Sequence, residues 1–349
     1  MEMTFRWYGH DDPVTLENIR QIPGMRGIVS AIYDIPVGEV WPRERIRQLK
    51  EDIESKGLKL SVIESVPVHE DIKLGKPSRD QLIANYAETI RNLGAEGVNV
   101  VCYNFMPVFD WTRTDLAFEL PDGSNALIFD EAVAAKMDPV SGELSLPGWD
   151  ASYTKEEMKN IIDEYGQIDK ETLWENLRYF IERIIPVAEA ADVKMAIHPD
   201  DPPYDIFGLP RIITDQAAVE RFLDLYDSPA NGLTLCVGSY ASDPANDAVA
   251  ILRYALGRER VNFMHARNIK LTGQGKSFQE SAHPTEYGSI DMYEVIKALV
   301  DHNWEGPIRP DHGRMIWGET GRPGYGLYDR ALGATYLYGL HEAITKENK

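Results

Sequence analysis

Short apolar runs alternate along the chain with segments of helical periodicity. Eight runs of five to eight residues predict buried strands, because each is bounded by polar or turn residues. They are 5–9, 27–32, 59–65, 98–105, 194–198, 233–238, 261–266 and 307–311. Between them, apolar residues recur every three or four positions, as Ile46, Leu49 and Ile53 do, which is typical of helices that cover a sheet. The predicted helices are 43–56, 79–93, 172–191, 215–226, 244–256, 292–300 and 327–344.

The regular order of strand and helix predicts an α/β fold with parallel strands. Eight such units fit a (β/α)8 TIM barrel. A doubly wound sheet uses the same units, but no glycine-rich dinucleotide-binding turn follows an early strand, and this weakens that alternative. We therefore predict one TIM-barrel domain that spans residues 1–349.

One connection is much longer than the others. A segment of about 65 residues, 106–170, follows the fourth strand and carries 14 acidic and 5 basic residues. It contains two predicted helices, 129–137 and 154–165. Long insertions between a strand and its helix lie on the catalytic face of such barrels. Two interpretations stay open: the insertion is a lid or a subunit contact, or it is a solvated excursion without a role in chemistry.

Charge and cysteine content narrow the possible partners. The 349 residues include 36 Lys and Arg and 56 Asp and Glu, so the formal net charge is −20. This charge argues against nucleic-acid binding and against docking on anionic lipid. No apolar stretch approaches a membrane span, and no secretory signal is visible at the N-terminus. Two cysteines cannot form a disulfide framework, so we expect a cytoplasmic protein. With nucleic acid and lipid disfavoured, we expect its partner to be a small molecule.

Four residues that can bind metal share one register. His198, Cys236, His265 and Asp311 end four consecutive predicted strands, and each follows an apolar residue or proline. Because side chains alternate along a strand, all four face the barrel axis if the preceding residues face the helices. A single such His or Cys is usually part of the core, but four in one register predict a transition-metal site. The ligand types do not choose among Zn²⁺, Fe²⁺ and Mn²⁺.

Several polar residues near the same end of the barrel can bind an anionic, hydroxylated substrate. Arg267, Asn268, Lys270 and Arg314 follow the last two strands, and His10 follows the first. A basic residue at the barrel mouth can hold a carboxylate, which the net charge of the chain would otherwise repel. Solvated surface charge is the competing interpretation, and it is strongest for Lys270.

Two further residues are candidates for proton transfer. His312 adjoins Asp311 and would point away from it on a regular strand, but Gly313 allows the backbone to turn. An imidazole, with its usual pKa of about 6.5, suits either acid or base. Tyr325 lies in the glycine-rich loop 321–326, and a phenol with a pKa of about 10 stays protonated at neutral pH. Packing roles are the alternative for both side chains.

Six motifs in order along the chain resemble those of the mannonate dehydratases. They are RWYG (6–9), IHPDDPP (197–203), LCVGS (235–239), HARN (265–268), PDHGR (310–314) and GRPGYG (321–326). The resemblance extends from the first strand to the last helix. It implies an enzyme of hexuronate breakdown that dehydrates D-mannonate to 2-keto-3-deoxy-D-gluconate, and it also implies a homodimer.

The resemblance also implies roles for individual residues. His198, Cys236, His265 and Asp311 would bind Mn²⁺ or Fe²⁺, and His312 and Tyr325 match the catalytic pair of the family. Reference pKa values favour His312 as base and Tyr325 as acid, although a bound metal can reverse that order. Two other functions stay open: a metal-dependent sugar or sugar-acid isomerase or epimerase on the same barrel, and a non-enzymatic sugar-acid sensor.

Overall fold

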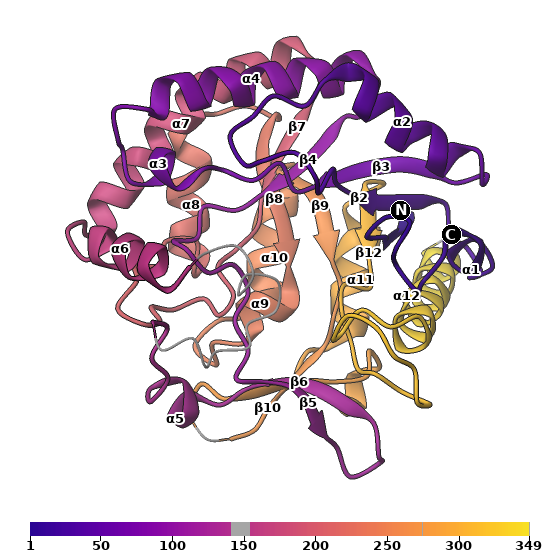
Figure 1. Ribbon diagram of the computed structural model, residues 1–349. Helices are drawn as coiled ribbons and strands as arrows, with labels where there is room; N and C mark the ends of the chain where they lie inside the picture. Colours follow the sequence, from indigo (N-terminus) through magenta and orange to yellow (C-terminus); the bar gives the residue numbers. More distant parts are fainter. Residues whose placement is uncertain (141–153, 274, 349) are drawn as a thin grey trace.

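Eight parallel strands close into a barrel in this computed structural model, which describes residues 1–140, 154–273 and 275–348 (Figure 1). Their order around the barrel is β1-β12-β9-β8-β7-β4-β3-β2. The strands are β1 (Glu2–Arg6), β2 (Gly27–Ser30), β3 (Lys59–Glu64), β4 (Val100–Tyr103), β7 (Lys194–Ile197), β8 (Asn231–Cys236), β9 (Val261–His265) and β12 (Pro307–Arg309). The predicted TIM-barrel fold is confirmed. β1 begins and ends three residues before the predicted strand 5–9, so Tyr8 lies beyond it.

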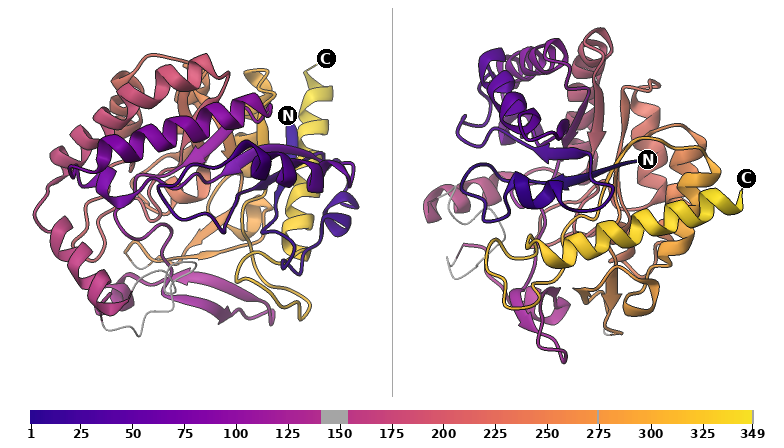
Figure 2. Two further views of the ribbon diagram at one scale, coloured as in Figure 1. Left: turned by 45° about the horizontal axis from the view of Figure 1, so that its top comes forward. Right: turned by 90° about the vertical axis from the view of Figure 1, so that its right-hand side faces the viewer.

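Helices cover the outside of the barrel, as the views in Figure 2 show. They are α1 (Leu16–Arg20), α2 (Arg43–Glu54), α3 (Glu70–Lys73), α4 (Arg79–Ala95), α7 (Lys170–Ala190), α8 (Gln216–Leu225), α9 (Val237–Ala241), α10 (Ala248–Gly257), α11 (Met292–Asp301) and α12 (Tyr328–Glu347), with the 3-10 turn η1 (Thr285–Tyr287). The seven predicted barrel helices are confirmed. α10 starts four residues later than predicted because the Asp247 side chain caps it by accepting from the amide of Ala250. In the described part of the chain, no helix is both long and apolar enough to cross a bilayer.

Two apolar layers support the strands from both sides. The large outer layer lies between the strands and the helices and contains Phe5, Ile28, Met195 and Leu235. A smaller cluster is formed by alternate residues on the other face of the strands, and we place it inside the barrel. It consists of Val29, Val62, Val100, Cys102, Ala196 and Phe263. The prediction that Cys102 belongs to the core is confirmed, since this side chain is buried in the inner cluster.

A second, antiparallel sheet was not expected from the sequence. Its order is β10 (Ile269–Leu271), β11 (Phe278–Glu280), β6 (Asn125–Phe129) and β5 (Asp115–Glu119). Two strands come from the segment 106–170 and two from the loop after β9, so the sheet joins parts of the chain about 150 residues apart. Figure 1 shows β5, β6 and β10 together at the lower edge, on the opposite side of the molecule from α2 and α4.

The two helices predicted within residues 106–170 have different outcomes. The prediction 129–137 is largely wrong, because Phe129 ends β6 and pairs with Phe278 of β11, and only α5 (Glu131–Ala134) is helical there. The prediction 154–165 is confirmed by α6 (Lys155–Tyr165), which Thr154 and Glu157 begin with a capping box. Residues 141–153 of the segment lie outside the described residues.

Candidate active site

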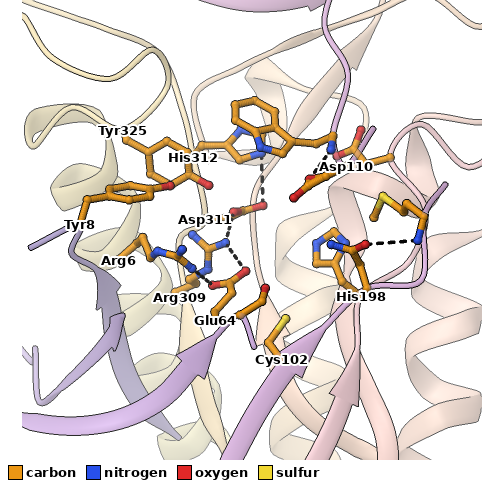
Figure 3. Close-up of a pocket in the computed structure, with 15 residues that line it drawn as sticks. Arg6, Tyr8, Glu64, Cys102, Asp110, His198, Arg309, Asp311, His312 and Tyr325 are labelled. Atoms are coloured by element: carbon orange, nitrogen blue, oxygen red, sulfur yellow. Dashed lines mark hydrogen bonds and ion pairs between the residues drawn. The ribbon is translucent and has the colours of Figure 1, made fainter. Parts of the chain in front are cut away.

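A cavity of about 550 Å³, partly open to solvent, lies at the C-terminal ends of the barrel strands. His198, Asp311, His312 and Tyr325 are in its wall, and Trp111 enters it from the segment 106–170. Figure 3 shows His198 across the cavity from Tyr325. This is the end of the barrel at which the sequence predicted the chemistry.

Three of the four predicted metal ligands form a compact group. Each of His198, Cys236 and His265 offers one ligand atom, and these atoms lie within 4.8 Å of one another. Cys236 and His265 end β8 and β9 and are partners in the strand register, while His198 immediately follows β7. The shared position at neighbouring strand ends therefore brings the side chains together as predicted.

Asp311 lies beside this group. Its Oδ2 is 3.6 Å from Cys236 Sγ and 3.7 Å from His265 Nδ1. β12 ends at Arg309, so Asp311 is two residues past the strand, and its φ of 62° is in the left-handed region. This turn at Asp311 itself lets both Asp311 and His312 line the cavity. The sequence had assigned the turn to Gly313, one residue after His312.

The donor atoms suit a transition metal. His198 Nδ1 is 2.7 Å from the carbonyl oxygen of Pro199, which leaves Nε2 for a ligand. His265 Nδ1 is buried and has no hydrogen-bond partner among the described residues. The Arg309 side chain donates to His265 Nε2 at 2.9 Å, and Glu64 Oε1 lies 3.4 Å from the same nitrogen. While Nε2 accepts from Arg309, the proton of the neutral ring is on Nδ1. Binding a metal through Nδ1 would require the other tautomer, in which Nε2–H faces Glu64 in place of the hydrogen bond from Arg309.

Charges around the group shift its pKa values in opposite directions. Burial lowers the pKa of His198, but its hydrogen bond with Cys236 and the nearby carboxylates outweigh burial and raise it to about 9. Burial, followed by the positive charge of Arg309, holds the pKa of His265 well below its usual value. Burial raises the pKa of Asp311, but Arg309 and other cations hold it well below its usual range. At neutral pH Asp311 is therefore a carboxylate and His265 a neutral imidazole, which are the charge states in which these groups bind a metal.

A charged wall that the sequence analysis missed is formed by Arg6, Glu64 and Arg309. Arg6 Nη1 is 2.9 Å from Glu64 Oε2, and Arg309 Nη2 is 3.0 Å from Glu64 Oε1 (Figure 3). Burial raises the pKa of Glu64, but Arg309, His265 and Arg6 lower it to about 2. Each of these charged residues is the last residue of its strand. That position is the same signal that identified Cys236 and His265.

The two predicted proton-transfer residues meet aromatic neighbours in the cavity. The His312 ring stacks on Trp111 with centroids 4.7 Å apart, and it lies 5.7 Å from the Tyr325 ring. Tyr325 is 7% exposed, and its ring centroid lies 5.0 Å from that of Tyr8. Burial raises the pKa of Tyr325 although Arg309 opposes the shift, so the phenol stays protonated at neutral pH. Tyr8 and Trp111 were missed because aromatic residues beyond strand ends carry little signal.

The five predicted substrate-binding residues are not among the residues that line this cavity in the described part of the chain. Arg267 is fully buried and pairs with Asp201 at 2.6 Å and with Glu280 at 2.9 Å. The Asn268 amide bonds the backbone of Ile290 as both donor and acceptor. Asn268 therefore holds the surrounding loops in place, whereas Arg267, whose Nε is also 2.9 Å from Asp311 Oδ2, contacts one of the predicted metal ligands.

The other three are nearer the surface. Lys270 is exposed on β10. Arg314 Nη1 forms an ion pair with Asp122 at 3.0 Å. The His10 side chain is 77% exposed and lies 3.1 Å from Asp52 Oδ2. Their positions follow from loop paths that alternation along a strand does not describe.

Comparison with known proteins identifies the family. The profile of the D-mannonate dehydratase (UxuA) family matches residues 1–349. The chain belongs to this family. It is 75% identical over 349 residues to a mannonate dehydratase of Streptococcus uberis, and the match covers 100% of both chains. It also matches the crystal structure of mannonate dehydratase from Streptococcus suis serotype 2 at 60% identity and a TM-score of 0.93, covering 100% of this chain and 96% of that one.

These matches confirm the predicted family and the predicted dehydration of D-mannonate. A D-psicose 3-epimerase from Clostridium cellulolyticum H10 has a TM-score of 0.57 at 14% identity, and the match covers 99% of each chain. At that identity the likeness shows the barrel fold alone. The isomerase or epimerase alternative therefore receives no support beyond the fold.

Proposed function

We propose that this chain converts D-mannonate to 2-keto-3-deoxy-D-gluconate and water in the cavity at the mouth of the barrel. The observation that carries the proposal is a His–Cys–His group whose His198 lines the same cavity as Asp311, His312 and Tyr325, in a chain of the D-mannonate dehydratase family. The reaction removes the C2 proton and the C3 hydroxyl and leaves an enol, which becomes the ketone.

His198, Cys236, His265 and Asp311 would hold the metal, for which we propose Mn²⁺ or Fe²⁺. The imidazoles suit Fe²⁺, and the carboxylate suits Mn²⁺. When bound, a divalent cation supplies Lewis-acid stabilisation of the negative charge that develops beside the substrate carboxylate.

The cations of the charged wall are the best candidates to bind the substrate carboxylate. Arg6 and Arg309 both line the cavity. Arg309 Nη1 is buried and has no hydrogen-bond partner in the described structure, so it can donate to a bound anion. We propose that Arg267 and Asn268 act on substrate binding only indirectly, Asn268 through the loops that it fixes and Arg267 also through Asp311, which is 2.9 Å from its Nε.

Proton transfer is assigned to the aromatic side of the cavity. We propose that His312 takes the C2 proton, since its ring faces the cavity beside Asp311. Tyr325 would protonate the departing C3 hydroxyl, because burial keeps its own proton in place at neutral pH. Arg309, whose guanidinium lies 6.0 Å from the Tyr325 ring, would stabilise the phenolate that results.

The direct test is turnover of D-mannonate by purified protein loaded with Mn²⁺ or Fe²⁺. The expected product is a 2-keto-3-deoxy acid, which is lighter than the substrate by one water. A product of unchanged mass would favour isomerisation or epimerisation instead. No product with either metal would reject the proposed function, and binding of mannonate without turnover would support a sensor. Elemental analysis of protein as purified identifies the metal.

Two further proposals concern the state of the protein. A homodimer is implied by the resemblance to the family, and analytical ultracentrifugation tests it by mass. A cytoplasmic location is supported by the two cysteines, both of which are free and buried. Fractionation of the source cells tests the location.

A further inference from the structure

A neutral cluster of four buried charges lies next to the cavity. It consists of Arg113, Asp201, Arg267 and Glu280, and we call it the buried ion cluster. Arg113 is 2.7 Å from Asp201 and 2.9 Å from Glu280, and Arg267 is 2.6 Å and 2.9 Å from the same two carboxylates. Every member is at most 1% exposed on its side chain. Such a cluster is costly to bury unless it is fully paired, so its position suggests a use beyond stability.

One member of the cluster also reaches His312. Glu280 Oε1 is 3.3 Å from His312 Nδ1, a buried nitrogen that forms no hydrogen bond among the described residues, so this carboxylate is an acceptor within reach of it. Asp311 lies on the other side of the imidazole, with its Oδ2 3.7 Å from Nε2. Trp111 stacks on the face of the same ring with an interplanar angle of 25°. Glu280 therefore lies at one edge of the imidazole and Trp111 on one face, and Nε2 is on the side of Asp311.

We propose that Glu280 is a positioning residue that fixes the orientation and tautomer of His312. By accepting the Nδ1–H, the carboxylate places the imidazole lone pair on Nε2, on the side of Asp311 and the cavity. A carboxylate behind the distal nitrogen of a catalytic histidine is an established way to hold one tautomer. This inference rests on the proposed role of His312 as base.

The surroundings of Glu280 keep it suitable for this task. Burial alone would favour the protonated carboxyl, but Arg267, His312 and Arg113 lower the pKa of Glu280 to about 2. The side chain is therefore a carboxylate at neutral pH and can only accept hydrogen bonds. The second sheet has a part in this arrangement, because Glu280 ends β11 and Arg113 lies just before β5.

The competing explanation is that Glu280 only neutralises the two arginines. Glu280→Gln and Arg113→Met distinguish the two, because both weaken the buried ion cluster and only the first alters the contact with His312. For Glu280→Gln we expect kcat to fall about 10- to 100-fold, with KM within about twofold and unchanged metal content. For Arg113→Met we expect a lower melting temperature but kcat within about threefold of wild type. Equal losses of kcat in the two variants, or a rise in KM alone for Glu280→Gln, would overturn the proposal.

The tautomer can also be read directly in the wild-type chain, which keeps the test decisive if Glu280→Gln does not fold. Long-range proton–nitrogen correlation spectra of metal-free protein with nitrogen-15 histidine report which ring nitrogen carries the proton, and His312→Gln assigns the signals. We expect Nδ1–H for His312. Observation of the Nε2–H tautomer would overturn the inference. Failure of wild type to dehydrate D-mannonate would instead reject the proposed function, and the spectra would still show whether Glu280 fixes the ring.

Discussion

Both sides of the cavity are formed by residues at the ends of barrel strands, but one side carries metal donors and the other an ion pair. On one side, His198 follows β7, and Cys236 and His265 end the neighbouring strands β8 and β9; their soft or borderline donors suit a metal. On the other side, β1 and β3 end in Arg6 and Glu64, which form a buried ion pair. Each side places its functional atoms at strand ends, where several strands converge on one point.

The comparison shows that the charged wall also supports the metal side. Arg309 connects the two, because it bonds His265 through Nε and lies 3.0 Å from Glu64 and 2.8 Å from Asp311 through Nη2. A change on the metal side should therefore remove metal binding, whereas a change on the charged wall away from Arg309 should spare it.

The largest effect is expected from Cys236→Ser, which replaces the thiolate by a weaker donor. We expect bound metal and activity to be lost together, because the Lewis acid that stabilises the developing charge is no longer held. Elemental analysis and the mannonate assay measure both. Cys102→Ala is the matched control, since that thiol also lines the cavity but lies outside the group of His198, Cys236 and His265, so this variant should keep the metal. Full metal content in Cys236→Ser would remove this residue from the ligand set.

Tyr325→Phe should separate chemistry from metal binding. The ring keeps its packing against Tyr8, but the proton donor is gone, so we expect kcat to fall about 10²- to 10⁴-fold with normal metal content. Tyr8→Phe, which removes the neighbouring hydroxyl, should give a smaller fall. If kcat of Tyr325→Phe stays near that of wild type, the acid is another residue.

The charged wall should stabilise the fold at neutral pH and lose this effect only in acid. The pKa of Glu64 is about 2, below its usual 4.5, so its ion pairs contribute fully above pH 4.5 and are lost as the pH falls through 2. The contribution is about 3 kcal/mol of the free energy of unfolding. Urea denaturation between pH 5 and pH 2 measures it, and Glu64→Gln should flatten the dependence. An equally steep dependence in Glu64→Gln would contradict this assignment.

Arg6→Met tests the charged wall without touching a ligand. Loss of one charged hydrogen bond to the substrate carboxylate should raise KM about 10-fold, with metal content unchanged. Arg6→Lys, which keeps the charge, should recover part of the loss. An unchanged KM in Arg6→Met would assign carboxylate binding to Arg309 alone.

The smallest effect is expected from Lys270→Ala. Lys270 is exposed on the edge strand β10, so we expect KM within about twofold of wild type, as for most surface changes. Steady-state kinetics with D-mannonate measure it. A KM raised tenfold would restore Lys270 as a substrate-binding residue.

The fold was predictable because each strand and helix carries its own periodicity. The group of His198, Cys236 and His265 was predictable because residues at strand ends obey simple alternation. Asp311 and His312 lie beyond their strand, and their placement depends on the left-handed backbone conformation of Asp311, which no sequence pattern predicts. Arg6, Glu64 and Arg309 follow the alternation rule, but arginine and glutamate do not stand out among 92 charged residues as histidine and cysteine do. The second sheet depends on pairing between loops distant in sequence, which local patterns do not contain.

The second sheet makes the β5–β6 hairpin and the loop that carries β10 and β11 depend on each other for pairing. Phe129 of β6 and Phe278 of β11 stack at 5.7 Å, and β11 has β6 on one side and β10 on the other. A relative that lost the β5–β6 hairpin would leave β11 with a bare backbone edge and an uncovered aromatic ring, a combination that invites aggregation. The β5–β6 hairpin and the β10–β11 loop should therefore be gained, shortened or lost together in evolution. For the same reason, grafting one of them onto another barrel should require transfer of both.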